Sequence, residues 1–218
     1  MKTQKLNLKG AAILFTMLSM SVSVTQCTEL QGMEEGSESD DLTSESISQQ
    51  QELGEEEISG ILFMREEEKL ARDVYLYLYE IHPLRPFLNI SKSEQAHMDA
   101  IKYLIDTYKL IDPVGDNLPG VFQNEELQEL YDELIEKGSK SREEALKVGA
   151  LIEEVDIIDL QTELEETAKN EDVIRVFTNL CSASENHLRA FVRVLALYDV
   201  DYEPVLLEQE EFDRILEN

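Results

Sequence analysis

The sequence is poor in the residues that several common protein classes require. Its two cysteines, Cys27 and Cys181, are too few for a disulfide framework or a four-cysteine metal site. Tryptophan is absent, and alternating β-branched runs bounded by turn residues are scarce. The five prolines and nine glycines leave room for long helices, and 42% of the residues are hydrophobic. We therefore predict an all-α fold with a substantial core.

Positive charge is also scarce. The chain has 19 lysine and arginine residues against 47 aspartate and glutamate residues, which gives a formal net charge of -28. A nucleic-acid-binding protein needs clustered basic residues, and a phosphate backbone would be repelled by this surface. The composition therefore excludes nucleic acid as a partner and indicates metal cations instead.

The first 27 residues have the pattern of an export signal. Three lysines precede an apolar run from Ala11 to Val24, which is shorter than the roughly 20 residues of a membrane-spanning helix. We therefore favour export over an N-terminal membrane anchor. The tetrapeptide ending at Cys27 resembles a bacterial lipoprotein box, but Gln26 replaces the usual small residue. Lipidation of Cys27, with membrane attachment, and ordinary signal cleavage both stay open, and we expect an extracytoplasmic or envelope-associated protein.

Three further regions follow the signal. Residues 28–57 contain eleven acidic side chains and no basic one. Such a stretch buries too little apolar area to offset its chain entropy, so we predict a disordered linker. We place the folded domain at residues 58–203 and a C-terminal tail, with a weak helical pattern, at residues 204–218.

Four long helices are predicted from apolar residues at three- and four-residue spacing, over residues 58–82, 91–110, 141–167 and 171–198. Pro83 and Pro86 should end the first, Ser91 or Ser93 should cap the second, and Ser141 should cap the third. Short links join the first pair and the last pair, whereas about thirty residues with a short helix near 124–137 separate the pairs. This is the arrangement of a ferritin-like four-helix bundle with one long crossover.

Polar residues interrupt the apolar faces of three of these helices. Glu94 and His97 lie one turn apart on the second helix, and Glu153 and Asp156 lie one turn apart on the third. His187 lies on the apolar face of the fourth. Each residue alone is most simply a satisfied core residue or a side chain that reaches water. Their recurrence at the same kind of position favours a common site.

The first helix offers two candidates, Glu67 and Glu68, between which periodicity does not choose. Four carboxylates that meet in one core beside two imidazoles repel one another and cost free energy unless they are compensated. Two divalent ions would balance four carboxylates, and a mixed oxygen and nitrogen ligand set suits iron or manganese. The pattern therefore predicts a metal centre.

Several strings resemble known proteins. The run from Glu68 to Tyr75 is similar to the first helix of rubrerythrin-type proteins, in which a ligand Glu precedes a Tyr by seven residues, and this favours Glu68. Glu94 and His97 match the Glu-x-x-His of the second helix. Residues 65–202 as a whole resemble a family of ferritin-like proteins of unknown function. The resemblance implies a di-iron carboxylate centre that reacts with oxygen or peroxide, and implies Tyr75 as a hydrogen-bond donor to a ligand.

One position departs from the resemblance. Glu153 matches the ligand Glu of the third helix and Asp156 a further acidic position, but Ser184 stands where a Glu three residues before His187 is expected. Glu185 is turned about 100° away on the helix. Either Asp156 supplies the missing oxygen, or the second metal position is weak, or the site holds a single ion.

The leading hypothesis is therefore an exported ferritin-like protein with an iron centre, or manganese as the alternative. Its metal ligands would be Glu68, Glu94, His97, Glu153, Asp156 and His187. Redox turnover would need an external electron donor, because no four-cysteine domain is present. The alternatives are a metal carrier or store without turnover and a metal-free bundle that binds a partner. Whether the protein forms a homodimer stays open.

Overall fold

The computed structural model describes residues 52–217, and within them it contains helices and no strand. The elements are α1 (Glu55–Ile81), α2 (Arg85–Thr107), α3 (Glu125–Gly138), α4 (Arg142–Thr162), the π-helical turn η1 (Glu163–Thr167), α5 (Glu171–Ala196) and α6 (Gln209–Glu217). The all-α prediction is confirmed. The predicted signal, Cys27 and most of the predicted linker lie outside the described residues.

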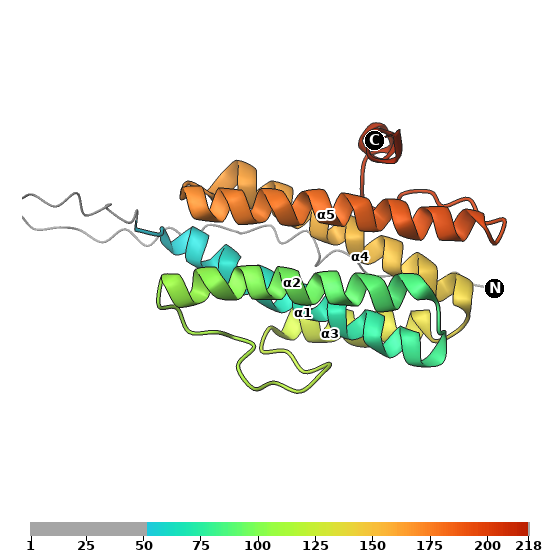
Figure 1. Cartoon of the computed structure of the whole chain (residues 1–218), viewed down its shortest axis with the longest axis horizontal. Coiled ribbons are helices and arrows are strands. Elements are labelled where there is room, and N and C mark those ends of the chain that lie inside the picture. Colours follow the sequence, from blue (N-terminus) through green and yellow to red (C-terminus); the bar gives the residue numbers. More distant parts are fainter. Residues whose placement is uncertain (1–51, 218) are drawn as a thin grey trace, which may run out of the picture. The chain divides into compact units, whose positions relative to one another are not determined.

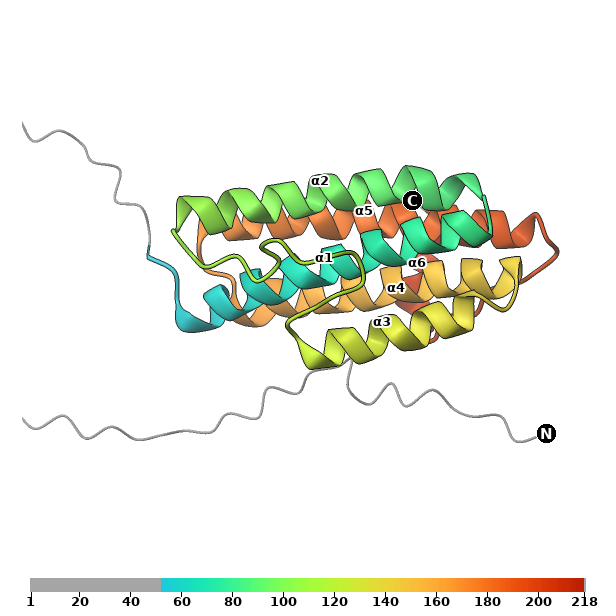
Figure 2. The same cartoon turned by 90° about the horizontal axis from the view of Figure 1, so that it is seen from below.

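Four long helices lie side by side in two antiparallel hairpins (Figures 1 and 2). Helix α1 packs most extensively on α2, and α4 on α5. The loop after α2 and the short helix α3 connect the hairpins, so that α2 and α4 run in the same direction (Figure 1). Helix α3 packs on the outside of α1 and α4.

One helix end near a proline differs from the prediction. Helix α2 begins at Arg85, before the predicted residue 91, and Pro86 lies in its first turn. Proline fits there because the first backbone N–H groups of a helix have no intrahelical acceptor. Ser141 caps α4 as predicted, since its side chain accepts a hydrogen bond from the Glu144 N–H. The third predicted helix ends in the π-helical turn η1.

The segment predicted as a C-terminal tail includes helix α6. Phe212 and Ile215 of α6 are buried, and Arg189 Nη1 donates a 2.6 Å hydrogen bond to the Ile215 carbonyl. The chain before α6 is held by Glu154 of α4, whose carboxylate accepts hydrogen bonds from the Tyr202 hydroxyl and the Val205 N–H. These contacts attach α6 to the helices. Within residues 52–217, no helix combines the length and apolarity needed to cross a membrane.

Two apolar layers fill the space between the long helices. One is mainly aliphatic and includes Ile61, Met64, Ile101, Leu104, Leu160 and Phe177. The other contains the rings of Tyr75, Phe87 and Phe191, whose centroids lie 5.3 to 6.1 Å apart. Gly149 makes room for this second layer, because a Cβ there would lie 2.4 Å from the Phe191 ring. Between the two layers, all four long helices contribute polar side chains.

Candidate metal centre

The six residues predicted as ligands are all buried between the apolar layers. The most exposed of them, His187, has 9% of its surface accessible. They come from the middle of the four long helices: Glu68 from α1, Glu94 and His97 from α2, Glu153 and Asp156 from α4, and His187 from α5. The structure thus brings these residues to the inside of the helices, and their role as metal ligands stays a prediction.

Two groups of three side chains are close enough to bind an ion each. In the first group, His97 Nδ1 lies 3.1 Å from Glu68 Oε2 and 2.8 Å from Glu94 Oε2. In the second, His187 Nδ1 lies 3.0 Å from Glu94 Oε1 and 3.4 Å from Glu153 Oε2. Within each group the ligand atoms lie within 4.8 Å of one another. Glu94 belongs to both groups and turns one oxygen toward each imidazole.

The contact between Glu94 and His187 is not an ordinary hydrogen bond. Although Glu94 Oε1 and His187 Nδ1 are 3.0 Å apart, both atoms are buried and neither has a partner in hydrogen-bond geometry. Two ligands bound to one ion at roughly 2.1 Å, about a right angle apart, lie about 3 Å from each other. The spacing therefore fits two ligands of a shared cation.

The hydroxyl groups of Ser93 and Tyr75 contact the side chains of the two groups at their periphery. The Ser93 hydroxyl lies 3.0 Å from His187 Nε2 and 3.5 Å from His97 Nε2, so both rings turn Nδ1 inward. Metal-binding histidines usually engage their second ring nitrogen in this way. The Tyr75 hydroxyl donates a hydrogen bond to Glu153 Oε1. The sequence does not reveal this role of Ser93, because a serine near a predicted helix start indicates a cap, whereas Ser93 lies inside α2.

Asp156 lies beside the two groups and is not a member of either. The buried Ser184 hydroxyl donates to its Oδ2, whereas Oδ1 is buried and has no donor. Ser184 therefore orients Asp156 from the position where the resemblance implied a glutamate. Glu185, the next residue on α5, lies outside the cluster and accepts a 2.8 Å hydrogen bond from Arg214 Nη2 of α6.

Burial and mutual repulsion raise the pKa of most carboxyl groups in the cluster. The pKa of Glu68 is well above its usual range because of burial and the charge of Asp156. Burial and Glu153 raise the pKa of Asp156 to about 7, and burial also raises the pKa of Glu153. A bound cation would oppose these effects by stabilising the ionised carboxylates.

For the two histidines and Glu94, attraction between opposite charges outweighs the effect of burial on the pKa. Burial alone would lower the pKa of His97, but Glu68 and Glu94 outweigh it and raise the value to about 11. Glu153 and Glu94 raise the pKa of His187 to about 10 in the same way, against burial. Burial would raise the pKa of Glu94, but the two imidazolium groups lower it to about 2. In the metal-free cluster, the protons on the two imidazoles therefore supply the positive charge that balances the carboxylates.

Most buried carboxylates of the domain are of two kinds; the exceptions are Asp73, which pairs with Lys69 and Arg72, and Glu153, which accepts a hydrogen bond from Tyr75. Those outside the cluster receive hydrogen bonds from backbone N–H groups at chain connections: Glu57 from Gly54, Lys169 and Asn170, Glu66 from Gln123 and Asn124, and Glu154 from residues 205–207. Those in and beside the cluster keep buried oxygens without a donor, on Glu67, Glu68, Glu94 and Asp156. Donor-free buried oxygens are rare in proteins, and these fit cation ligands.

Both candidates on α1 are buried, but they face different partners. Glu68 lies against His97, as described above. The carboxyl group of Glu67 lies instead against that of Asp159, one turn beyond Asp156 on α4. The structure therefore brings Glu68 into the candidate centre and places Glu67 beside it.

Comparison with known proteins gives the family. Residues 57–218 match the family described as "Uncharacterized protein domain (DUF2202)". The chain belongs to the DUF2202 family. It is 51% identical over 166 residues to uncharacterized protein MJ0754 of Methanocaldococcus jannaschii, which covers 76% of this chain and 89% of that protein. A crystal structure of hypothetical protein MJ0754 from Methanococcus jannaschii is similar, with a TM-score of 0.75, 50% identity, and coverage of 77% of this chain and 95% of that one. The expected uncharacterised family is confirmed, and the ferritin-like relationship stays a prediction.

Proposed function

We propose that this domain is a ferritin-like four-helix bundle that binds two divalent metal ions, iron first and manganese as the alternative. The observation that carries the proposal is the position of Glu94. Its two oxygens face the Nδ1 atoms of His97 and His187 in a buried cluster that has too few hydrogen-bond donors. Bundle cores that hold two ions use a shared set of Glu and Glu-x-x-His side chains in this way.

Each ion would have its own ligands. Glu68 and His97 would hold one ion, Glu153 and His187 the other, and Glu94 would contact both. Asp156, oriented by Ser184, would supply the fourth carboxylate. Four carboxylates balance the charge of two divalent ions, and the mixture of oxygen and nitrogen ligands suits iron or manganese.

When bound, iron supplies redox chemistry toward oxygen or peroxide. The chain itself contributes three things to such a site. The ring layer of Tyr75, Phe87 and Phe191 excludes water from one side. Ser93 fixes both imidazole rings. The Tyr75 hydroxyl keeps a proton next to Glu153, because burial and the nearby Glu153 charge hold the Tyr75 pKa well above its usual value.

The test is the metal content of the purified full chain from iron-replete cells, measured by mass spectrometry. The variant Glu94→Gln keeps the shape of the side chain and removes its charge. Glu185→Gln is the matched control, since Glu185 lies outside the cluster and pairs with Arg214 of α6. We expect near-stoichiometric metal in the wild type and the control, and a loss of most metal in Glu94→Gln. Equal and negligible metal in all three proteins would refute the proposal and favour a metal-free bundle that binds a partner.

A second assay separates turnover from storage. The iron-loaded, reduced protein is mixed with oxygen or with peroxide, and consumption is followed over several equivalents in the presence of an external reductant. Catalytic consumption supports the redox proposal. Retention of metal without consumption supports a carrier or store.

We also propose that the protein is exported and attached to a membrane through a lipidated Cys27. The support is the pattern of the first 27 residues. Cell fractionation of the wild type and Cys27→Ser tests this, because only lipidation predicts release of the variant from the membrane fraction.

A further inference from the structure

The two histidines of the cluster are held to different degrees. His97 Nδ1 lies 2.8 and 3.1 Å from oxygens of Glu94 and Glu68. His187 Nδ1 is buried and has no partner in hydrogen-bond geometry within residues 52–217. Its ring is oriented through Nε2, which lies 3.0 Å from the Ser93 hydroxyl. The same hydroxyl is 3.5 Å from His97 Nε2, at the limit of a hydrogen bond. The orientation of His187 therefore depends on Ser93 more than that of His97 does.

The two groups of ligands also differ in the helices that supply them. Glu68, Glu94 and His97 come from α1 and α2, which form one hairpin and pack extensively on each other. Glu94, Glu153 and His187 come from α2, α4 and α5, and so from both hairpins. Helix α2 packs on α5 much less extensively than on α1. The second group is therefore less firmly prearranged, and the contact of Ser93 with His187 is one of the links across it.

We infer that Ser93 is the positioning residue for one ion of the centre, the ion of Glu153, His187 and Glu94, and that this ion is the more weakly bound of the two. The inference rests on the proposed function. An imidazole that binds a metal through Nδ1 carries its proton on Nε2, and a partner for that N–H fixes the tautomer and the ring orientation. Loss of such a partner lowers metal affinity by about 10- to 100-fold.

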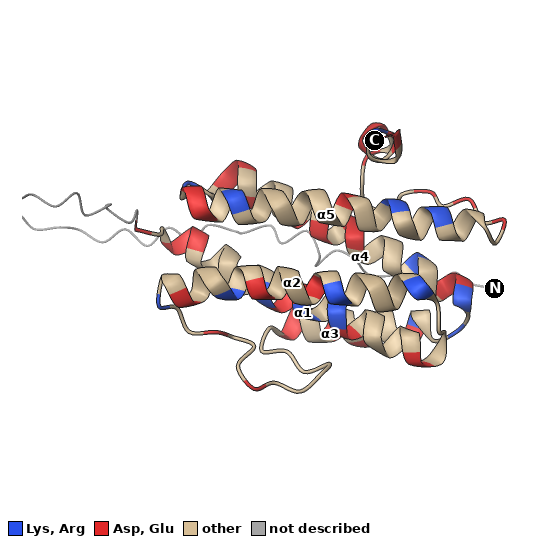
Figure 3. Cartoon of the chain, in the orientation of Figure 1, with Lys and Arg blue, Asp and Glu red and all other residues tan. Residues whose placement is uncertain are grey.

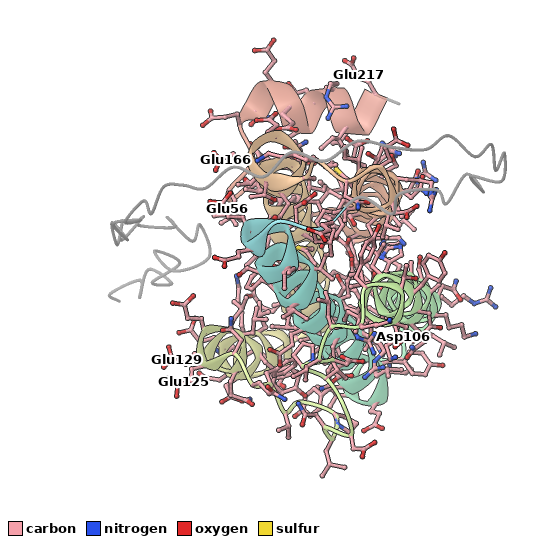
Figure 4. The ribbon with its side chains drawn as sticks, turned by 90° about the vertical axis from the view of Figure 1, so that its left-hand side faces the viewer. Glu56, Asp106, Glu125, Glu129, Glu166 and Glu217 are labelled. Atoms are coloured by element: carbon pink, nitrogen blue, oxygen red, sulfur yellow. The ribbon has the colours of Figure 1, made fainter. Side chains whose placement is uncertain are left out.

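The side of the cluster that Ser93 occupies is also its side nearest to solvent. His187 and His97 are 9% and 7% exposed, whereas the four carboxylates predicted as ligands are 4% exposed at most. Ser93 itself is partly exposed. Helix α3 covers α1 and α4, and in Figure 4 it lies on the side of α1 away from α2. An ion held by His187 is therefore close to solvent, which favours its exchange.

The experiment is a Mn²⁺ titration of the metal-free full chain, with free Mn²⁺ measured by its electron paramagnetic resonance signal. Ser93→Ala removes the hydroxyl, and Ser93→Thr keeps it. Ser91→Ala is the matched control, because it removes a buried hydroxyl from the same helix that donates to the Leu88 carbonyl. Circular dichroism melting of each protein checks that it folds.

Weak binding of Mn²⁺ to the acidic surface must be separated from binding to the centre. Acidic residues predominate at the end of the helices where α1 begins, and Glu56 and Glu166 lie there (Figures 3 and 4). Excess Mg²⁺ in each titration occupies such positions, because it prefers oxygen ligands to imidazole. Glu166→Gln is a second control, since it removes one of these charges and should leave the ions of the centre unchanged.

We expect the wild type and both controls to bind two Mn²⁺ per chain. Ser93→Ala should bind the first ion as the wild type does and the second about 10- to 100-fold more weakly. Ser93→Thr should restore the second ion. In ¹⁵N NMR of the metal-free proteins, the Nε2 signal of His187, assigned with His187→Gln, should shift in Ser93→Ala and return toward the wild-type position in Ser93→Thr.

Three results would overturn the role of Ser93 and leave the two-ion centre standing. The first is a folded Ser93→Ala protein that binds both ions with wild-type affinity. The second is an equal loss of affinity for both ions. The third is a loss of the second ion in Ser93→Thr as well as in Ser93→Ala, which would indicate packing instead of the hydrogen bond. If the wild type binds fewer than two ions of Mn²⁺ or Fe²⁺, the proposed function fails and this inference fails with it.

Discussion

The metal-free domain should lose stability as the pH rises from about 5 to about 8. A group whose pKa is higher in the folded state stabilises the fold below its unfolded pKa, and this contribution is lost as the pH rises through the folded pKa. Asp156, with a usual pKa of 3.8 and a folded pKa of about 7, behaves in this way. His187 and His97 do the same between 6.5 and their folded values of about 10 and about 11.

The size of the effect follows from these intervals. Each pH unit within an interval costs about 1.4 kcal/mol per group, so Asp156 alone loses on the order of 3 kcal/mol between about pH 5 and its folded pKa. Each histidine loses roughly 2 kcal/mol between about pH 6.5 and about pH 8. The groups interact, so the total is smaller than if they acted separately. It is still several kcal/mol, a large part of the roughly 5 to 15 kcal/mol by which domains are stable.

Glu94 sets the acid limit of the profile. Its pKa is lowered from 4.5 to about 2, so its contribution is present above 4.5 and is lost as the pH falls toward 2. The metal-free domain should therefore be most stable near pH 4, between the usual pKa values of Asp156 and Glu94, and weaken on both sides. With metal bound, the free energy of unfolding should rise with pH above this maximum, because metal ligands must lose their protons to bind.

Urea unfolding of the chelator-treated full chain, followed by circular dichroism at several pH values, measures this profile. Asp156→Asn is the comparison, since it removes one titrating group and should flatten the curve between about pH 5 and about pH 7. Addition of Mn²⁺ should stabilise the wild type more at high pH than at low pH. If the free energy of unfolding of the metal-free protein is constant or rises from about pH 5 to about pH 8, the raised pKa values of Asp156 and the two histidines are refuted.

Three further predictions concern single side chains. Tyr75→Phe removes the hydrogen bond to Glu153 and should weaken metal binding about tenfold in calorimetry, without loss of the fold. Gly149→Ala should lower the free energy of unfolding by about 1 to 3 kcal/mol, because its methyl group meets the Phe191 ring. Glu154→Ala should cost about 3 kcal/mol in urea unfolding, because three backbone N–H groups at residues 205–207 lose their acceptor.

Each of these changes has an outcome that would contradict its reasoning. Unchanged metal affinity in Tyr75→Phe would mean that Glu153 is held by other contacts. Gly149→Ala and Glu154→Ala should keep the metal stoichiometry of the wild type, since neither residue is in the cluster. Loss of metal from a folded Glu154→Ala protein would show that Glu154 acts on the centre and not only on the C-terminal chain.

Helical periodicity was enough to predict the long helices and the inward position of the polar residues. It works here because the apolar stripe of each long helix faces the same core, so an interrupting Glu94 or His187 must face that core too. It fails at the start of α2, because the sequence pattern places Pro86 after the end of one helix, whereas Pro86 lies in the first turn of the next. Proline restricts the chain in both contexts, and the local sequence does not separate them.

The remaining parts of the site depend on contacts between distant residues. Ser93 contacts His187, which lies 94 positions away, and this pairing follows from the packing of α2 on α5. Glu67 faces Asp159 only because α1 and α4 meet in one particular register. The attachment of residues 202–207 depends on Glu154. From the sequence alone, Glu154 cannot be distinguished from the candidate ligands on the same helix. Such pairings leave no periodic signal in the chain.

The number of buried carboxylates says little about the site, whereas the partner of each one says much. A carboxylate such as Glu57 or Glu154, held by backbone N–H groups, stabilises a chain connection and stays ionised without a metal. A carboxylate such as Glu68 or Glu67, with a buried oxygen and no donor, is destabilising in the metal-free protein and needs a proton or a cation. Both kinds occur on the same helices, α1 and α4. Selection for stability alone would favour apolar residues at the donor-free positions, so their convergence at one level of the helices supports the proposed metal binding.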